Sequence, residues 1–470
     1  MKARIAMAVA FLGVFAAFAA PSVTVQSAAQ DAATGVVTVE YTLSESAIVT
    51  FDVCTNGASV APERAWRVSG DINRKLAAGA HTLQWWPRSE WPDGTPPTGC
   101  RVALVPWTLE DPPDYMVVKL GINSNVTYYA TAGAVPFGVV SETSKRHQMV
   151  FRRVRAANVR WRMGTDGDTG NETPHYVTLT NDYYMAVFPT TYEQHNMVNG
   201  TSGTYGVVPD NRYHYENLRG ATSGHDWPTD GHAVAADSAI GRFRAQSGLT
   251  GLDLPTEAEW EYACRAGNPG KWCCGDNSNL LKDYGWYGYR YDAYIGAASG
   301  HYRPQVGLLK PNAFGIYDMH GMGFEWCLDW YAEGADYCTA GSDVTAPTGP
   351  ATGTGRVVRG GSYAHDHNIA RSAYRYTNGQ PPGTAYTTII YRLACPVDMR
   401  TAEDGVGTGG EPVSTFADVT GFDPVVVDSD GAGGFGTAVA PLDFKSRFDV
   451  LIDGLNFDSR KPFGFHLILR

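Results

Sequence analysis

The spacing most suggestive of chemistry in this chain is a pair of carboxylates, Asp318 and Glu325, seven positions apart. Between them lie Gly321 and Gly323, whose missing side chains let backbone carbonyls turn inward. Calcium prefers six to eight hard oxygen ligands in a flexible geometry, and such a loop can supply them. The segment therefore predicts a calcium site. The alternative is a glycine-rich turn whose carboxylates face solvent.

A second candidate for chemistry is the pair His365 and His367, separated by Asp366. Alternate residues of a strand lie on one face, so two imidazoles at this spacing could converge on one metal ion. His320 or Asp318 could complete such a site. The alternative is a surface loop that carries two histidines.

Tyr and Trp gather in residues 284–289, followed by Tyr291. Rings at this density can form a platform on which a sugar stacks. They can equally fill the core of a domain with few regular elements. We expect them mainly in the core.

The elements that would position these residues fall into two regions. With 470 residues, 43% hydrophobic and 18% charged, the chain is long enough for two or three globular domains. Alternating runs with turn residues between them predict an all-β sandwich over residues 30–125. The strands are expected at residues 37–43, 47–53, 81–86 and 101–107.

Beyond residue 145, strands alternate with two helices. One helical pattern covers residues 235–245, and the other opens with a capping box in which Thr256 is the N-cap and Glu259 the third helical residue. Residues 398–437 are rich in Gly and Asp and predict a linker. Residues 438–470 regain strand formers and predict a short β-rich segment.

The N-terminus predicts export. Lys2 and Arg4 precede a short apolar run, and small residues follow it, so residues 1–20 have the pattern of a signal peptide. An uncleaved anchor is the alternative, and no later stretch is apolar enough to span a membrane. The expected location is therefore secreted, periplasmic or cell-surface. A net charge of −11 without a basic face argues against nucleic-acid binding.

Eight cysteines in an exported protein favour disulfides. Cys54 and Cys100 could pair within the first region, whereas the connectivity of the others stays open. No pair of CxxC motifs is present, so a structural zinc site is not expected.

Four segments, in this order, resemble the formylglycine-generating-enzyme family, also called the sulfatase-modifying-factor family. They are residues 178–185, residues 254–263 (LPTEAEWEYA), residues 311–330 (PNAFGIYDMHG, then EW and DW), and residues 359–363 (RGGSY) followed by 370–372 and 391–394. The resemblance covers residues 145–397. It implies an α+β, C-type-lectin-like core with little regular secondary structure.

The resemblance also implies roles for particular residues. Asp318, Gly321, Gly323 and Glu325 match a segment that binds calcium in the family, and a second calcium site would use Asn279 and the carbonyl of Leu280. Ser362 and Arg371 match positions that line the family's substrate groove. We expect calcium as a structural cofactor.

The family's oxidation chemistry depends on two cysteines just after the RGGSY segment, which hold copper. Thiolates are the soft ligands that select Cu(I), and imidazole does not simply replace them. Here His365 stands at the first cysteine position, and no cysteine lies between Cys338 and Cys395. The sequence therefore argues against copper and against sulfatase maturation.

Two other functions follow from the sequence. The first is a non-oxidising binding or scaffold module whose lectin-like groove takes a peptide or carbohydrate outside the cytoplasm. The second is a metal-dependent oxidoreductase that uses His365 and His367 in the same groove. Whether the chain is an enzyme is therefore left open by the sequence.

Overall fold

The structure is a computed structural model, and it describes most of the chain between residues 20 and 397. The described residues are 20–56, 58–61, 64–91, 101–121, 124–166, 171–201, 206–288, 304–334, 337–377, 379–397 and 425–428. The predicted signal peptide (apart from Ala20), Cys100, Tyr289, Tyr291 and the predicted segment 438–470 lie outside these residues.

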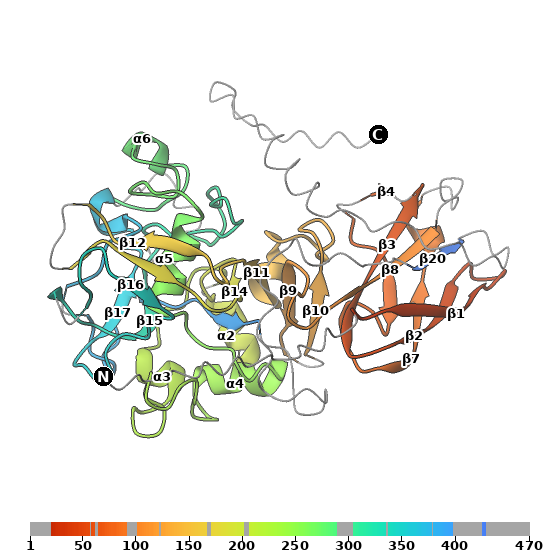
Figure 1. Cartoon of the computed structure of the whole chain (residues 1–470), viewed down its shortest axis with the longest axis horizontal. Helices are drawn as coiled ribbons and strands as arrows, with labels where there is room; N and C mark the ends of the chain where they lie inside the picture. The colour runs from red at the N-terminus through yellow and green to blue at the C-terminus, as the bar shows by residue number, and fades with distance from the viewer. Residues whose placement is uncertain are drawn as a thin grey trace, which may run out of the picture.

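The N-terminal region consists mostly of β-strands arranged in two sheets, at the right of Figure 1. The first sheet has the order β1 (Val23–Gln30), β2 (Val37–Leu43), β7 (Gly79–Trp85), β5 (Val68–Gly70). The second has the order β20 (Val425–Asp428), β8 (Arg101–Trp107), β3 (Ala47–Thr55), β4 (Ala58–Ser59), and β6 (Arg74–Leu76) also pairs with β3. The short 3₁₀ helix η1 (Pro87–Ser89) follows β7.

The two sheets share one hydrophobic core because their strands alternate buried and exposed residues. In β2, Val39 and Tyr41 are fully buried while Glu40 between them is exposed. Val39 faces Leu83 of β7 in the antiparallel register, and both belong to a cluster with Val53 of the second sheet. The strands predicted at 37–43 and 101–107 are confirmed residue for residue.

Strand β20 lies within residues 398–437, where the composition predicts a linker. Its residues pair antiparallel with β8, so that Val425 faces Leu104 and Asp428 faces Arg101. The described part of this segment thus adds a strand to the second sheet.

The second region is built around a five-stranded sheet of order β10 (Asn125–Tyr129), β9 (Tyr115–Lys119), β11 (Gln148–Val154), β14 (Tyr183–Ala186), β19 (Ala394–Pro396). Two smaller sheets have the orders β12 (Arg160–Met163), β13 (His175–Thr178), β16 (Asp343–Thr345) and β17 (Arg356–Arg359), β15 (Phe324–Trp330), β18 (Ile389–Ile390). Strands β9 and β10 therefore belong to the second region, although the predicted first region extends to residue 125.

Short helices surround these sheets, as Figure 1 shows. They are α1 (Glu142–Arg146), α2 (Tyr192–Asn199), α3 (Tyr215–Arg219), α4 (Ala239–Ser247), α5 (Glu257–Arg265) and α6 (Ser278–Leu281), with the 3₁₀ helix η5 (His367–Ala370). Among the described helices, none combines the length and hydrophobicity that a bilayer crossing requires.

The capping box predicted for α5 is present. The Thr256 hydroxyl accepts a hydrogen bond from the Glu259 amide at 3.2 Å, and the Glu259 carboxylate accepts one from the Thr256 amide at 2.8 Å. Helix α4 begins four residues later than the predicted start at residue 235, because Ser238 is its N-cap. The preceding residues form a turn instead, in which the Ser238 amide donates to the Ala235 carbonyl at 3.0 Å.

The two regions meet at β10. The Tyr128 amide donates to the Asn73 carbonyl at 2.7 Å, and Tyr128 packs in one buried cluster with Ile48 and Trp107 of the first region. The second region is therefore anchored to the first by apolar contacts as well as by the chain itself.

Helix α5 carries carboxylates into the interior, where buried arginines pair with them. Glu257 binds Arg375 in a bidentate pair at 2.6 and 2.9 Å. Glu261 binds Arg265 at 2.8 Å and also Arg359. Charge-assisted pairs of this kind fix the relative orientation of the elements that carry them. They hold α5 against β17 and the loop after it. This loop carries the candidate groove residues Ser362, His365, His367 and Arg371.

Candidate functional site

The candidate groove residues come after Gly360 and Gly361, which directly follow β17. Gly361 has a φ of +76°, and a Cβ there would lie 2.7 Å from the Ile369 carbonyl oxygen. The chain therefore folds back on itself, which only glycine permits at this position. The turn buries Ser362, whose hydroxyl oxygen is 2.6 Å from Nδ1 of His365.

His365 and His367 do not lie on a strand, so the reason for expecting their imidazoles on one face is wrong. His365 lies in a bend, and His367 opens η5 because the Asp366 carboxylate accepts the Asn368 amide at 2.9 Å as an N-cap. Side chains in this conformation do not alternate as they do in a strand.

The two imidazoles have different partners. The His365 ring packs edge-on against Phe324 at 5.4 Å, and burial lowers its pKa. Nδ1 of His367 is 3.1 Å from the Asp366 carboxylate, and its ring lies 5.7 Å from that of Trp272 and 5.9 Å from that of Tyr287. Nowhere in the described chain do three or more His, Cys, Asp or Glu side chains form a group that could hold a metal ion.

Arg371 is held in place by Glu172, a partner that the sequence did not reveal. Its guanidinium makes a bidentate pair with the Glu172 carboxylate at 2.6 and 2.8 Å, and its Nε donates to the Asn368 carbonyl at 2.9 Å. The Arg371 side chain remains 21% exposed, so this pair lies partly at the surface.

Asp318 is buried, and both of its carboxylate oxygens accept protein hydrogen bonds. One comes from the Trp286 indole at 3.2 Å and the other from the Gly307 amide at 2.7 Å. Burial raises the pKa of Asp318 to about 6.

Glu325 is also buried, and it pairs with Arg392. Nη2 and Nε of Arg392 donate to the two carboxylate oxygens at 2.7 and 3.0 Å, and the Trp260 indole donates at 2.8 Å. Each oxygen of Glu325 therefore has a donor.

Close packing explains why glycine stands at positions 321 and 323, between Asp318 and Glu325. A Cβ on Gly321 would lie 1.6 Å from the Trp286 carbonyl oxygen, and one on Gly323 would lie 2.9 Å from Ile390. Both carboxylates already accept protein hydrogen bonds, so a calcium ion bound by both would share their oxygens with these donors. Calcium at this loop stays a prediction.

Asn279 and Leu280 lie in α6. The Asn279 amide donates to the Asn277 side chain at 3.0 Å, and the Leu280 carbonyl accepts from the Asp283 amide at 3.0 Å. The Leu280 side chain is 46% exposed. A calcium site here also stays a prediction.

The described part of the aromatic segment divides between core and surface. Trp286 is buried in a cluster with Met322 and Ile390, as expected for core. Tyr287 is half-buried and lies beside His367, one of the candidate groove residues.

The cysteines do not form the expected disulfides: none joins two of the seven described cysteines. Cys327 is buried in an apolar cluster, and the Cys338 sulfur lies 3.2 Å from Nδ1 of His175. The predicted pairing of Cys54 with Cys100 lies outside the described residues.

A cavity of about 360 Å³ lies apart from the groove candidates, none of which lines it. Its lining includes Asp329, Trp330 and Arg375. Burial, with a further contribution from Glu257, raises the pKa of Asp329 to about 8, so this carboxyl keeps its proton at neutral pH.

Comparison with known proteins places the second region in a family. A family model described as the sulfatase-modifying factor enzyme 1-like (FGE-sulfatase) domain matches residues 140–395. The formylglycine-generating enzyme of Streptomyces coelicolor is 34% identical over 155 residues, which are 32% of this chain and 48% of that enzyme. The chain thus matches about half the length of this relative.

Other similar proteins carry different names. The serine/threonine-protein kinase pkn1 of Chlamydia pneumoniae is 35% identical over 146 residues, which cover 31% of this chain and 21% of the kinase. The solved structure of Treponema denticola variable protein 1 aligns with 53% of this chain and 95% of its own, at 25% identity and a TM-score of 0.40.

Proposed function

Because the chain belongs to the sulfatase-modifying-factor family, we propose that it is an exported member whose groove binds a peptide or carbohydrate without oxidising it. The observation that carries this proposal is the residue at the first cysteine position of the family. His365 stands there, with its ring nitrogen against Ser362, and no cysteine lies between Cys338 and Cys395. The thiolate pair that would select Cu(I) is missing from this segment.

The side chains beside this segment suit binding. Tyr287 and His367 place partly exposed rings near each other, with the buried Trp272 ring beside His367, and rings with a polar edge bind both sugars and peptides. The Arg371 guanidinium, which is 21% exposed and paired with the buried Glu172 carboxylate, offers a charged donor next to them. The surface therefore offers both stacking and hydrogen bonding.

The proposal also includes the type of fold in each region, the location of the protein and a structural ion. We take the second region as a C-type-lectin-like core and the two N-terminal sheets as a sandwich that spaces or assists it. The signal-like residues 1–20 support a secreted, periplasmic or cell-surface location. Calcium is proposed only as a structural ion, and a rise in melting temperature with calcium that a chelator reverses would support it.

The binding proposal is tested with peptide and oligosaccharide arrays probed by the purified chain. We expect Arg371→Gln and Tyr287→Ala each to weaken a selected ligand at least about tenfold, the effect of losing roughly 1.4 kcal/mol. Arg160→Gln, on the exposed pair with Asp343, is the matched control. Equal binding by all of these variants would overturn the assignment of the groove.

The alternative function is a metal-dependent oxidoreductase that uses His365 and His367. Their different partners give it less support than the binding proposal has. Metal analysis of the purified chain separates the two. Redox-active copper or iron at unit stoichiometry, lost in His365→Ala, would replace the binding proposal with this alternative.

A further inference from the structure

Two adjacent cysteines form the tip of a hairpin beside the groove. The backbones of Trp272 and Gly275 bond to each other at 3.2 and 2.9 Å, so Cys273 and Cys274 are the two turn residues. Both cysteines are half-buried, and therefore partly open to solvent. The turn displays two neighbouring thiols at the surface.

The two thiols interact, and the interaction makes them chemically different. The hydrogen bond from the Cys273 thiol lowers the pKa of Cys274, and the same contact is the largest cause that raises the pKa of Cys273. The thiolate is the nucleophilic form of cysteine, so Cys274 is the more reactive of the pair.

The turn is held rigidly from behind. The Cys273 amide donates to Nε2 of His320 at 3.1 Å, and Nδ1 of His320 is 2.8 Å from the Ala370 carbonyl oxygen, which it binds as a donor. The buried sulfur of Cys264 lies 3.8 Å from the same Nε2. These contacts fix the backbone of Cys273 without engaging its sulfur.

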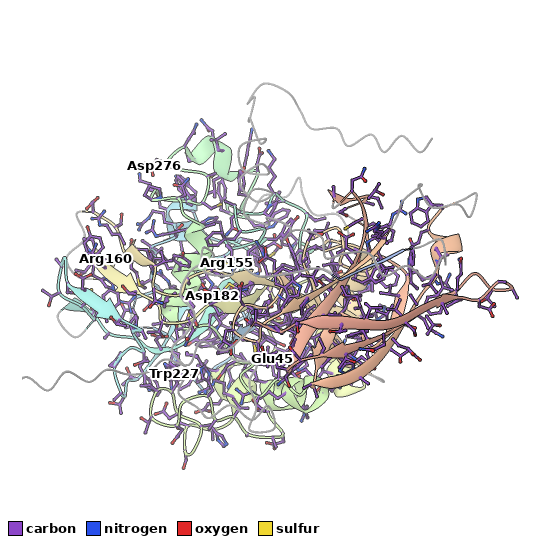
Figure 2. The ribbon with its side chains drawn as sticks, turned by 45° about the vertical axis from the view of Figure 1, so that its right-hand side comes forward. Glu45, Arg155, Arg160, Asp182, Trp227 and Asp276 are labelled. Carbon is purple, nitrogen blue, oxygen red and sulfur yellow. The ribbon has the colours of Figure 1, made fainter. Side chains whose placement is uncertain are left out.

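The hairpin is joined directly to residues 362–372, which include the candidate groove residues. The Ser372 amide donates to the Lys271 carbonyl at 2.8 Å, and the Trp272 indole donates to the His367 carbonyl at 3.3 Å. Asp276, which accepts the Lys271 amide at 2.7 Å, is labelled in Figure 2 at the top of the second region, away from the β-rich region. Both thiols are themselves partly exposed, so a partner can reach them.

We propose that Cys273 and Cys274 form a reversible redox site that reacts with disulfides by thiol–disulfide exchange. The Cys274 thiolate attacks one sulfur of the incoming disulfide, forms a mixed disulfide and releases the other sulfur as a thiolate. Cys273 then gives up its proton and attacks the Cys274 sulfur, which forms the Cys273–Cys274 bond and releases the second thiolate. One disulfide is reduced to two thiols, and two protein thiols are oxidised.

Adjacent positions make this a reversible bond rather than a structural one. Consecutive Cα atoms are about 3.8 Å apart, whereas most disulfides join Cα atoms about 4.4–6.8 Å apart. A bond outside the usual geometry is more easily reduced, and such bonds are the labile or catalytic ones. The Cys273–Cys274 disulfide should therefore form under oxidising conditions and be reduced again by a modest excess of thiol.

The test treats the purified full chain with glutathione disulfide and maps the thiols by mass spectrometry of peptides. The expected product is a Cys273–Cys274 disulfide that reduced glutathione reverses. Cys273→Ser should stop the reaction at a glutathione adduct on Cys274. Cys274→Ser should react several-fold more slowly at residue 273, because burial still raises the pKa of that thiol once the contact with the Cys274 thiol is gone.

Cys338→Ser is the matched control and should react like the unmodified chain, since Cys338 lies against His175, away from the hairpin. A stable glutathione adduct on the unmodified chain would overturn the proposal, because it would show that Cys273 does not resolve the intermediate. A disulfide that includes Cys264, or no reaction at either turn cysteine, would also overturn it.

Discussion

The two regions of this chain are stabilised in different ways. Among the described residues up to Leu109, Thr50 is the only buried polar side chain, and it accepts a hydrogen bond from the Trp107 indole at 2.8 Å. In the second region, five arginines rank among the largest fully buried side chains: Arg219, Arg356, Arg359, Arg375 and Arg392.

The difference shows where each region is vulnerable. The free energy gained by apolar burial is non-directional and roughly proportional to the buried area. Truncating a core side chain in the first region should therefore lower the free energy of unfolding according to the volume that is removed. A buried ion pair is weak evidence for stability as a pair, but removing one partner leaves a charge without compensation. The framework of the second region, which positions the groove, should therefore be intolerant of single changes and tolerant of paired ones.

The largest effect is expected for Arg392→Ala. The fully buried Glu325 carboxylate would keep only the Trp260 indole as a donor, and the free energy of unfolding should fall by about 3–5 kcal/mol. Denaturant unfolding followed by tryptophan fluorescence measures this loss. The paired change Arg392→Met with Glu325→Leu should recover most of it, and a paired loss as large as the single one would contradict the comparison.

The next effect is expected for Leu83→Ala in the first region. Leu83 is fully buried between the two sheets, and a leucine truncated in a core costs about 2–5 kcal/mol. The control is Leu280→Ala, at a side chain that is 46% exposed, which should change stability by less than about 0.5 kcal/mol. Similar losses in the two variants would show that the first region lacks the core described above.

An effect that depends on pH is expected at Asp329. Burial raises its pKa in the folded chain to about 8, whereas the unfolded carboxyl loses its proton near its ordinary value. The contribution of Asp329 to stability is therefore fully present at low pH and is lost as pH rises toward 8. The slope should reach up to about 1.4 kcal/mol per pH unit. Asp329→Asn should remove it in thermal unfolding measured from pH 5 to pH 8, and an unchanged slope would refute this account.

The smallest effect is expected at the surface. Arg160 and Asp343 pair at 2.6 Å but have side chains that are 51% and 63% exposed, and Figure 2 labels Arg160 at the outer edge of the second region. Arg160→Ala should cost less than about 1 kcal/mol, and less still at high salt. A loss comparable to that of Arg392→Ala would mean that burial does not separate the two kinds of pair.

Features set by neighbouring residues could be predicted from the sequence. The alternation in residues 37–43 and the capping box at Thr256 are local, and both are confirmed. The conformation at His365 and His367 was predicted wrongly, although a local signal was present. Asp366 two residues before Asn368 is a capping pattern that competes with a strand.

Other features of the site could not be predicted from spacing. Glu172 and Arg371 are 199 positions apart, and no local pattern around either residue predicts that the two form a pair. The placement of His320 behind Cys273, and the pairing of Glu325 with Arg392, likewise depend on how distant segments pack. The family segments identified the candidate groove residues, but the contacts of these residues required the fold.

The most direct test of the account is to offer the purified chain, supplied with copper and oxygen, a peptide that carries the Cys-x-Pro-x-Arg signal of sulfatases. Mass spectrometry then determines the fate of the peptide cysteine. If the chain binds the peptide without oxidising it, the peptide cysteine should remain a cysteine and no formylglycine should be detected. Formylglycine in the peptide, formed by the unmodified chain and lost in Arg371→Gln, would contradict it.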